Sequence, residues 1–492
     1  MTESLTCNSR RPFVIPSQGG CGPTGAPLQS ALAESAKKTF AERINMPRRP
    51  LSSRPATLLA LAAGLLLALT AARAQSLQEV YEAARAYDAS YLAARALADS
   101  AQYRLEQSRA LQRPSASLTS SLTRNETDPP SSLTNPGGSS IGATTAAVAL
   151  AGRQPLFNRG NAATVSQAEK SFEVASADLQ TAEQDLIVRV AQTYFDVLIS
   201  QDALAAVQAD KKSTGEQLAS AKRNFEVGTA TITDTREAQA RFDLATAREI
   251  AAENDLLTKR IALDQLIGRN NVTPKPLATP VALPAVAPAQ VDDWVAPSQT
   301  THPSVRRALL GLDVAKLEID KARAGTLPTV DAVGSLSSSR AVVSGASGTT
   351  SNASLGVQLN WPLFTGGSVQ NRIKETLSLE EKSRNDLDAA RRAVAQGTRV
   401  AFFGVQSGQA QAKALEAAEA SSKLALEATQ LGYRVGVRVN LDVLNAQTQL
   451  FNTQRDLSKA RYDVLLAGLR LRQAAGNLQA SDIVGVNALL AK

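Results

Sequence analysis

The sequence contains little of what most enzymes use for chemistry. Its 492 residues include one histidine and two cysteines, Cys7 and Cys21, and both cysteines precede Gln75. The rest of the chain can therefore form neither a disulfide nor a cysteine-based metal site. The histidine, His302, stands in a Thr-His-Pro triplet typical of a helix start, so we interpret it as a capping residue. A glycine-rich phosphate-binding loop is also missing. We therefore expect no enzyme activity, no metal and no cofactor.

An excess of charge of one sign is missing as well. The formal net charge of +8 is concentrated in residues 1–74, which hold nine Lys/Arg and three Asp/Glu. The remainder has 44 basic and 42 acidic residues, a balance of about +2. Because acidic and basic side chains are so evenly matched there, we expect no nucleic-acid partner.

The apolar run Ala56–Leu69 is too short to be a transmembrane helix. Arginines precede it and Ala72-Arg73-Ala74 follows it, which is the pattern of a signal peptide over residues 46–74. We interpret Met46 as the true start. Residues 1–45 are then a mis-assigned extension or, alternatively, a disordered leader.

Proline and glycine are rare in two long stretches of the chain. Residues 160–227 contain no proline and, between Gly160 and Gly215, no glycine. This predicts one helix of about 100 Å, and residues 367–435 predict a second of similar length. Such helices exceed what a globular domain needs.

The first long helix carries two apolar seams. Val165, Phe172, Leu179 and Leu186 recur every seven residues, and Val174, Thr181, Val188 and Phe195 form a second seam on nearly the opposite side. A helix with opposed seams has a neighbour on each side, so we expect a curved wall of helices.

The second half of the chain repeats the first after about 208 residues. Gln154-Pro155-Leu156-Phe157 returns as Trp361-Pro362-Leu363-Phe364, and Phe225-Glu226-Val227-Gly228 returns as Tyr433-Arg434-Val435-Gly436. Shared spacing of several markers indicates one supersecondary unit built twice.

Each repeat reads as a helix, two strands, a long helix and a shorter helix. A helix over Leu77–Leu111 opens the first repeat. Alternation of apolar and small polar residues predicts the strands, and Asn125–Ser140 and Ser344–Asn352 are predicted loops. The expected boundaries are a first repeat at 75–268 (strands 114–124 and 141–157, helices 160–227 and 234–268), a proline-rich linker at 269–300, a second repeat at 301–477 (strands 328–340 and 351–364, helices 367–435 and 442–476), and a C-terminal tail at 478–492.

These motifs resemble the TolC-type outer membrane efflux protein family over about Gln75 to Gln479. The resemblance rests on the two Pro-Leu-Phe motifs, on Phe225–Gly228 with Ile232-Thr233-Asp234, and on Tyr433–Arg438 with Leu441–Leu444. It implies a mainly α protein with membrane β structure. Three chains would share a twelve-stranded outer-membrane β-barrel that continues into a twelve-helix periplasmic α-barrel.

The resemblance also implies a function. Family members are passive exit ducts in the outer membrane of Gram-negative bacteria. Their partners are a periplasmic adaptor (membrane fusion) protein and an inner-membrane ABC or proton-driven transporter. Since no cysteine stands at the cleavage site for a lipid anchor, the chain resembles the type I protein secretion branch. A multidrug or metal efflux duct on the same fold is an alternative. A periplasmic coiled-coil adaptor or scaffold is another, and it would lack the paired strands.

Site residues follow from the same resemblance. The helical tips, Val227, Gly228 and Thr229 and also Val435, Gly436 and Val437, would contact the adaptor. Asp234, Tyr433 and Arg438 would form a gate through a Tyr433–Asp234 hydrogen bond and an Arg438–Asp234 ion pair. Asp442 would form an acidic ring at the entrance. The family has a second acidic position three residues later, where this chain has Asn445, so we expect a weaker ring.

Overall fold

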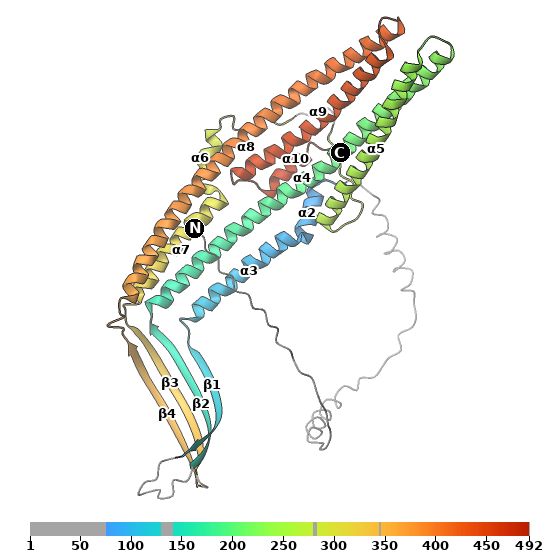
Figure 1. Ribbon diagram of the computed structural model, residues 1–492. Helices are drawn as coiled ribbons and strands as arrows, with labels where there is room; N and C mark the ends of the chain where they lie inside the picture. The colour runs from blue at the N-terminus through green and yellow to red at the C-terminus, as the bar shows by residue number, and fades with distance from the viewer. Residues whose placement is uncertain (1–74, 129–140, 279–282, 344–345, 492) are drawn as a thin grey trace, which may run out of the picture. The chain divides into compact units, whose positions relative to one another are not determined.

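The computed structural model describes residues 75–128, 141–278, 283–343 and 346–491 (Figure 1). The predicted signal peptide, the extension before it and both cysteines lie outside these residues. The described part forms one compact unit. None of the helices in these ranges combines the length and the apolar character needed to cross a bilayer.

The described elements are mainly helical. In chain order they are α2 (Leu77–Tyr87), α3 (Ala89–Ala110), β1 (Ser115–Thr127), β2 (Ile141–Phe157), α4 (Arg159–Glu226), α5 (Ile232–Ile267), α6 (Asp292–Thr301), α7 (Pro303–Ala324), β3 (Thr329–Val343), β4 (Ala346–Asn360), α8 (Ser368–Arg434), α9 (Asn440–Ala474) and α10 (Ala480–Asn487).

The strands form one antiparallel sheet in the order β1-β2-β3-β4. It lies at one end of the helices, and the α4–α5 and α8–α9 turns lie at the other (Figure 1). The strands run further than the alternation pattern indicated. β3 continues to Val343, and β4 begins at Ala346 inside the predicted loop 344–352, so that loop prediction was wrong. The pairing persists because ladder hydrogen bonds join backbone groups, whatever the polarity of the side chains. β1 likewise reaches Thr127, and residues 129–140 of the other predicted loop lie outside the described residues.

The helices form a wall, and the order of the helices differs between its two halves. In the half next to the sheet, α3, α4, α7 and α8 pack side by side in that order. In the other half the order is α5, α4, α9 and α8. The helix α4 has 68 residues and spans both halves, with a neighbour on each side throughout. Its length is about 100 Å. Two half-length helices therefore lie end to end beside each long one.

A polar side chain divides the first helix of each repeat. The expected helix Leu77–Leu111 is interrupted at Asp88, whose carboxylate accepts a 2.8 Å hydrogen bond from the backbone N–H of Tyr91 and caps α3. In the second repeat, His302 ends α6 and caps α7 by accepting a hydrogen bond from the N–H of Ser304. The interpretation of His302 as a capping residue is confirmed. Burial lowers the pKa of its imidazole, although the backbone of Gln473 opposes this.

The first and last described residues of the chain meet the linker in a belt around the middle of α4. Its apolar core includes Leu77, Leu186, Phe195 and Ile483. The side chain of Tyr194 is fully buried. Its hydroxyl lies within donating distance of two backbone carbonyl oxygens, 3.0 Å from that of Gln75 and 3.1 Å from that of Lys275. The same hydroxyl accepts a 2.8 Å hydrogen bond from the N–H of Lys275. Burial raises the pKa of this hydroxyl. Tyr194 thus ties α4 to both segments.

Two boundary predictions were wrong in this belt. The expected tail 478–492 contains α10, whose Ile483 is 1% exposed, because its apolar side chains complete the core. The expected linker 269–300 contains all of α6 except Thr301, and Trp294 and Val295 of that helix are buried. Pro297 lies inside α6 and removes one N–H donor from that helix.

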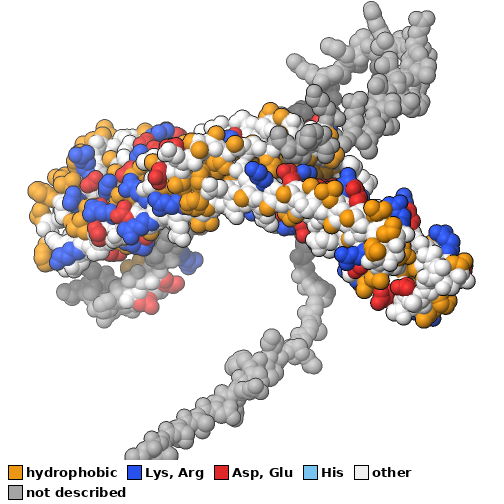
Figure 2. Space-filling model, turned by 90° about the horizontal axis from the view of Figure 1, so that it is seen from above, with side chains coloured by type: hydrophobic (Ala, Val, Ile, Leu, Met, Phe, Trp, Pro, Cys, Tyr) orange, Lys and Arg blue, Asp and Glu red, His pale blue; other side chains and the backbone are white. Residues whose placement is uncertain are grey.

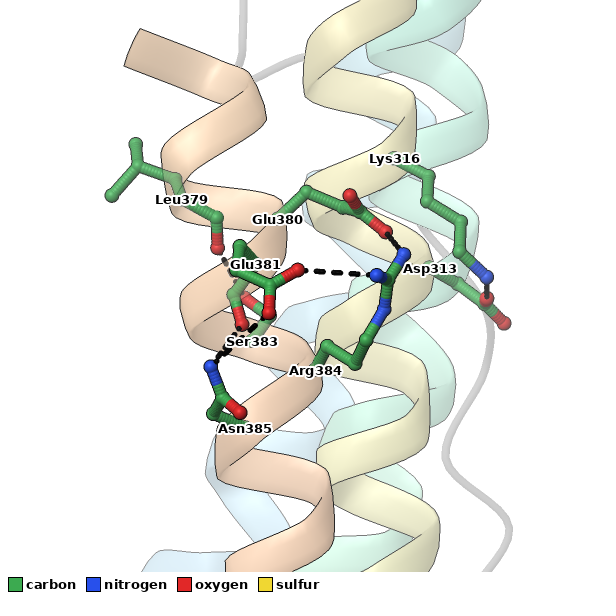
Figure 3. Close-up of polar contacts among 8 residues, drawn as sticks. All are labelled: Asp313, Lys316, Leu379, Glu380, Glu381, Ser383, Arg384 and Asn385. Atoms are coloured by element: carbon green, nitrogen blue, oxygen red, sulfur yellow. Dashed lines mark hydrogen bonds and ion pairs between the residues drawn. The ribbon is translucent and has the colours of Figure 1, made fainter.

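The helix surfaces carry charges of both signs. On α8, Arg384 bridges Glu380 at 2.8 Å and Glu381 at 3.1 Å, and on α7 Lys316 pairs with Asp313 (Figure 3). Such pairs, three or four residues apart, contribute about 0.3–0.5 kcal/mol each. On the face shown in Figure 2, basic and acidic side chains are interspersed.

Candidate channel wall and helical tips

The sheet has one apolar face. Residues paired across neighbouring strands lie on the same face, and Leu118, Leu150 and Leu336 form one such row. The same face carries Leu122, Val148, Leu355, Val357 and Leu359. These side chains are exposed, Leu118 by 71% and Leu355 by 91%, and nothing in the described residues covers them. An exposed apolar face of this kind fits a lipid environment.

The opposite face is small and polar. One of its rows consists of Ser117, Ala151, Ser335 and Ser354, and the two hydroxyls of Ser335 and Ser354 lie 2.8 Å apart. Apolar residues on one face and small polar residues on the other are typical of a strand that separates lipid from a water-filled lumen.

One ion pair stands on the polar face at its helical end. The guanidinium of Arg153 on β2 donates to the carboxylate of Asp331 on β3 at 2.6 Å. The Asp331 side chain is 7% exposed and the Arg153 side chain 59% exposed. Sequence reasoning missed this pair, because the two residues are 178 positions apart and no local motif links them.

The two helical turns are built in the same way. Gly228 and Gly436 follow the helix ends with φ of 78° and 81°. Other residues adopt such angles only with strain. The N–H of Thr229 donates to the carbonyl of Asn224, and the N–H of Val437 donates to that of Gly432. This arrangement leaves Val227 73% and Val437 75% exposed.

Thr229 and Val435 are exposed too. All six predicted tip residues therefore lie at two adjacent turns, where the chain reverses direction after each long helix (Figure 1).

The three predicted gate residues have other partners within the described chain. Asp234 accepts from the backbone N–H and the hydroxyl of Thr231, at 3.0 and 2.8 Å, and caps α5. Tyr433 accepts from the side-chain amide of Asn224 at 3.3 Å. Arg438 lies 3.7 Å from Asp442. The predicted Tyr433–Asp234 and Arg438–Asp234 contacts are therefore not made inside this single described chain.

The entrance residues Asp442 and Asn445 each have a basic neighbour. Arg438 lies beside Asp442, and Arg241 of α5 donates a 2.7 Å hydrogen bond to the side-chain oxygen of Asn445. Arg241 was not predicted, because nothing in the sequence shows which α5 residue faces α9.

A strip of buried polar groups lies between the two hairpins. Asp210 of α4 and both Asn440 and Gln447 of α9 are buried. Each has at least one side-chain atom without a hydrogen-bond partner among the described residues. Burial raises the pKa of Asp210, and the nearby Arg248 and Arg241 oppose that shift. Unsatisfied buried groups weaken packing, so they lower the stability of this hairpin interface.

Comparison with known proteins identifies the family. The model of the family described as "Outer membrane efflux protein" matches residues 80–269 and 297–477. The chain is 32% identical over 422 residues to the outer membrane protein TolC of Vibrio cholerae, covering 84% of this chain and 94% of that protein. The chain belongs to the outer membrane efflux protein family.

Two further similarities agree with this membership. The alkaline protease secretion protein AprF of Pseudomonas aeruginosa is 32% identical over 337 residues, which cover 67% of this chain and 69% of AprF. The crystal structure of the outer membrane protein VceC from Vibrio cholerae shares the fold, with a TM-score of 0.67 at 19% identity, over 81% of this chain and 96% of VceC. This outer membrane efflux protein therefore resides in the outer membrane and extends into the periplasm, and it serves export.

Proposed function

We propose that three copies of this outer membrane efflux protein close into one passive channel. The observation that carries the proposal is the pair of unpaired sheet edges, β1 and β4. Unpaired backbone groups are not tolerated in lipid, so these edges must pair with other copies. Two copies would give eight strands, whose interior side chains fill, whereas three give twelve strands and leave a lumen.

The helical edges support the same assembly. In the tip half, α5 and α8 are the outer members of the wall. Ile250, Leu257 and Ile261 of α5 share one face of that helix and are more than half exposed. In a closed ring this apolar stripe packs against α8 of the neighbouring copy. The helices then form the periplasmic α-barrel, with the polar sheet face lining the lumen above it.

The channel does no chemistry and takes its substrates from a periplasmic adaptor and an inner-membrane transporter. The exposed tips Val227–Thr229 and Val435–Val437 are the proposed adaptor contacts. Type I protein secretion is the proposed route, supported by the similarity to AprF, a protease secretion protein. Multidrug or metal efflux remains the alternative on this fold.

We place the gate between copies. Asp234, Tyr433 and Arg438 have other partners inside the chain, so in this proposal their predicted contacts form across the ring. Asp234 retains a free lone pair for such a bond. The double variant Y433F/R438S should then leave the pore leaky, with raised single-channel conductance in planar bilayers. Unchanged conductance would contradict this gate.

Cysteine crosslinking tests the assembly, because the described chain contains no cysteine. We would combine Ser117→Cys on β1 with single cysteines along β4, which β2 and β3 separate from β1 within a chain. Oxidation should give covalent trimers at one register. A cysteine along β3 in place of β4 is the control and should give none. A monomeric protein that conducts no ions would refute the proposal.

Complementation tests the route. The gene is expressed in a strain that lacks its own exit channel but retains a type I adaptor and transporter. Restored protease secretion without restored drug or metal tolerance supports type I secretion. The reverse result supports the efflux alternative.

A further inference from the structure

The apolar face of the sheet forms the lipid-facing band of the proposed barrel. The two ends of this band carry different kinds of side chain. At the helical end, Phe157, Trp361 and Phe364 are exposed. Phe157 is the one aromatic side chain among the described strand residues. The far end therefore lacks the aromatic girdle that usually anchors a barrel at a membrane interface.

Two arginines occupy that far end. Arg340 on β3 lies in one row with Leu122, Ala146 and Thr349, which places it on the apolar face. Arg124 on β1 lies on the same face, one row further from the helices, beside Thr144 and Val342. Both side chains are exposed. Glu126 lies one row beyond them.

Strand geometry gives the depth of these arginines. Val330, at the helical end of the apolar face, and Arg340 are ten residues apart on β3. Ten residues extend about 34 Å along a strand, or about 25 Å along the barrel axis at a tilt of about 40°. Since this equals the usual height of an apolar band, about 25 Å, Arg340 and Arg124 stand where the acyl chains end.

We propose that Arg124 and Arg340 bind the phosphate groups of lipopolysaccharide in the outer leaflet. This rests on the proposed barrel, in which the helices lie in the periplasm and the far end of the sheet therefore faces the outer leaflet. Lipopolysaccharide carries its lipid A phosphates at the boundary between acyl chains and sugars. Arginine pairs with phosphate through two parallel N–H donors, and its aliphatic stem lies along apolar surface. The arginines thus anchor the outer end of the band, as the aromatic side chains do the inner end.

The test compares lipid binding of purified full-length variants. Wild type, R124Q/R340Q and a control, R153Q/D331N, are titrated in detergent with bisphosphorylated lipid A. Native mass spectrometry then gives relative association constants. The control removes charges from the same sheet on the opposite, polar face. A charge near a lipid surface contributes about 1 kcal/mol, so we expect about a fivefold loss for each arginine and about 25-fold for the pair. The control should bind as wild type does.

Two further ligands identify the source of the phosphate. Lipid A stripped of its phosphates should bind wild type and R124Q/R340Q equally weakly. Phosphatidylglycerol should show a much smaller dependence on the arginines than lipid A. Equal binding of lipid A by wild type and R124Q/R340Q would overturn the proposal, as would an equal arginine dependence for phosphatidylglycerol.

Conductance measured on the same preparations separates this inference from the proposed function. If the variants and wild type all conduct but bind lipid A alike, only the lipid site is refuted. If wild type forms no pore, the barrel itself fails.

Discussion

Arg241 on α5 donates a 2.7 Å hydrogen bond to the side-chain oxygen of Asn445 on α9, which joins the two hairpins near their tips. The arginine therefore stands beside the position where relatives of this chain were expected to carry a second acidic residue. With Arg438 beside Asp442 as well, the entrance residues carry no net negative charge.

This contact predicts how cation preference can be restored. Asn445→Asp alone should change the reversal potential in a KCl gradient very little, because Arg241 neutralises the new carboxylate. Asn445→Asp with Arg241→Gln should raise cation preference several-fold, since each copy in the proposed trimer then adds one uncompensated carboxylate to the entrance. Arg260→Gln, on the same helix but far from the tip, is the control. An equal effect of the single and the double variant would show that Arg241 does not neutralise this site.

The Asn224–Tyr433 hydrogen bond predicts coupled effects on opening. It joins α4 to α8 across the hairpins at 3.3 Å. Asn224→Ala should shift the balance toward the open pore about fivefold, the effect of losing about 1 kcal/mol. Tyr433→Phe also loses the proposed bond to Asp234 and should shift the balance further. The double variant should open no further than Tyr433→Phe alone, which single-channel recordings can measure. Additive effects would mean that the two side chains act separately.

The Arg153–Asp331 pair, at the helical end of the sheet, predicts that removing one charge lowers the stability more than removing both. Arg153→Met leaves a buried carboxylate without its partner and should lower the stability, by less than the loss of a fully buried pair because Arg153 is largely exposed. The temperature at which the proposed trimer dissociates in SDS should fall accordingly. Arg153→Gln with Asp331→Asn should be close to wild type, because no buried charge remains. If Arg153→Met melts like wild type, the pair contributes nothing to stability.

The burial of Asp210 predicts that replacing it with asparagine stabilises the protein by an amount that depends on pH. Because burial raises its pKa above the ordinary 3.8, the folded chain favours the protonated carboxyl, and ionisation at neutral pH destabilises it. Asp210→Asn should therefore raise the melting temperature of the helices at pH 7. The gain should shrink as the pH falls through the raised pKa toward 3.8 and vanish well below 3.8, where Asp210 is protonated in both folded and unfolded chains. Circular dichroism melts at several pH values measure this, with the exposed Asp243→Asn as control. A gain independent of pH would show that the charge is not the cause.

The large features of the fold could be predicted because they are periodic. The seams through Phe172 and Phe195 indicate neighbours on both sides of α4, and Gly228 and Gly436 mark the two turns. The break at Asp88 could not be found, since a capping aspartate looks like any polar residue within a helical pattern. The helix α10 was missed for a related reason, as Ile483 is buried in a core that also includes distant residues such as Leu77 and Leu186.

The residues of the candidate site also divide into those that the sequence predicts and those that it does not. The tip residues follow from a local motif, and the structure places all six at the turns. Partners such as Arg241 and Asn224 depend on the rotation of one hairpin against another, which no sequence spacing records. Asp331 is paired because β2 and β3 are neighbours in the sheet, although they belong to different repeats.

Because the belt holds α4 at Tyr194, the half of α4 between Tyr194 and the turn can act as a lever. From Tyr194 to its end at Glu226 the helix extends about 48 Å. With the pivot fixed by the segments around Gln75 and Lys275, a tilt of about 10° would move the turn by roughly 8 Å and leave the packing around the pivot intact. A displacement large enough to unblock a pore thus requires only a small rotation, and the proposed barrel in the membrane need not change shape.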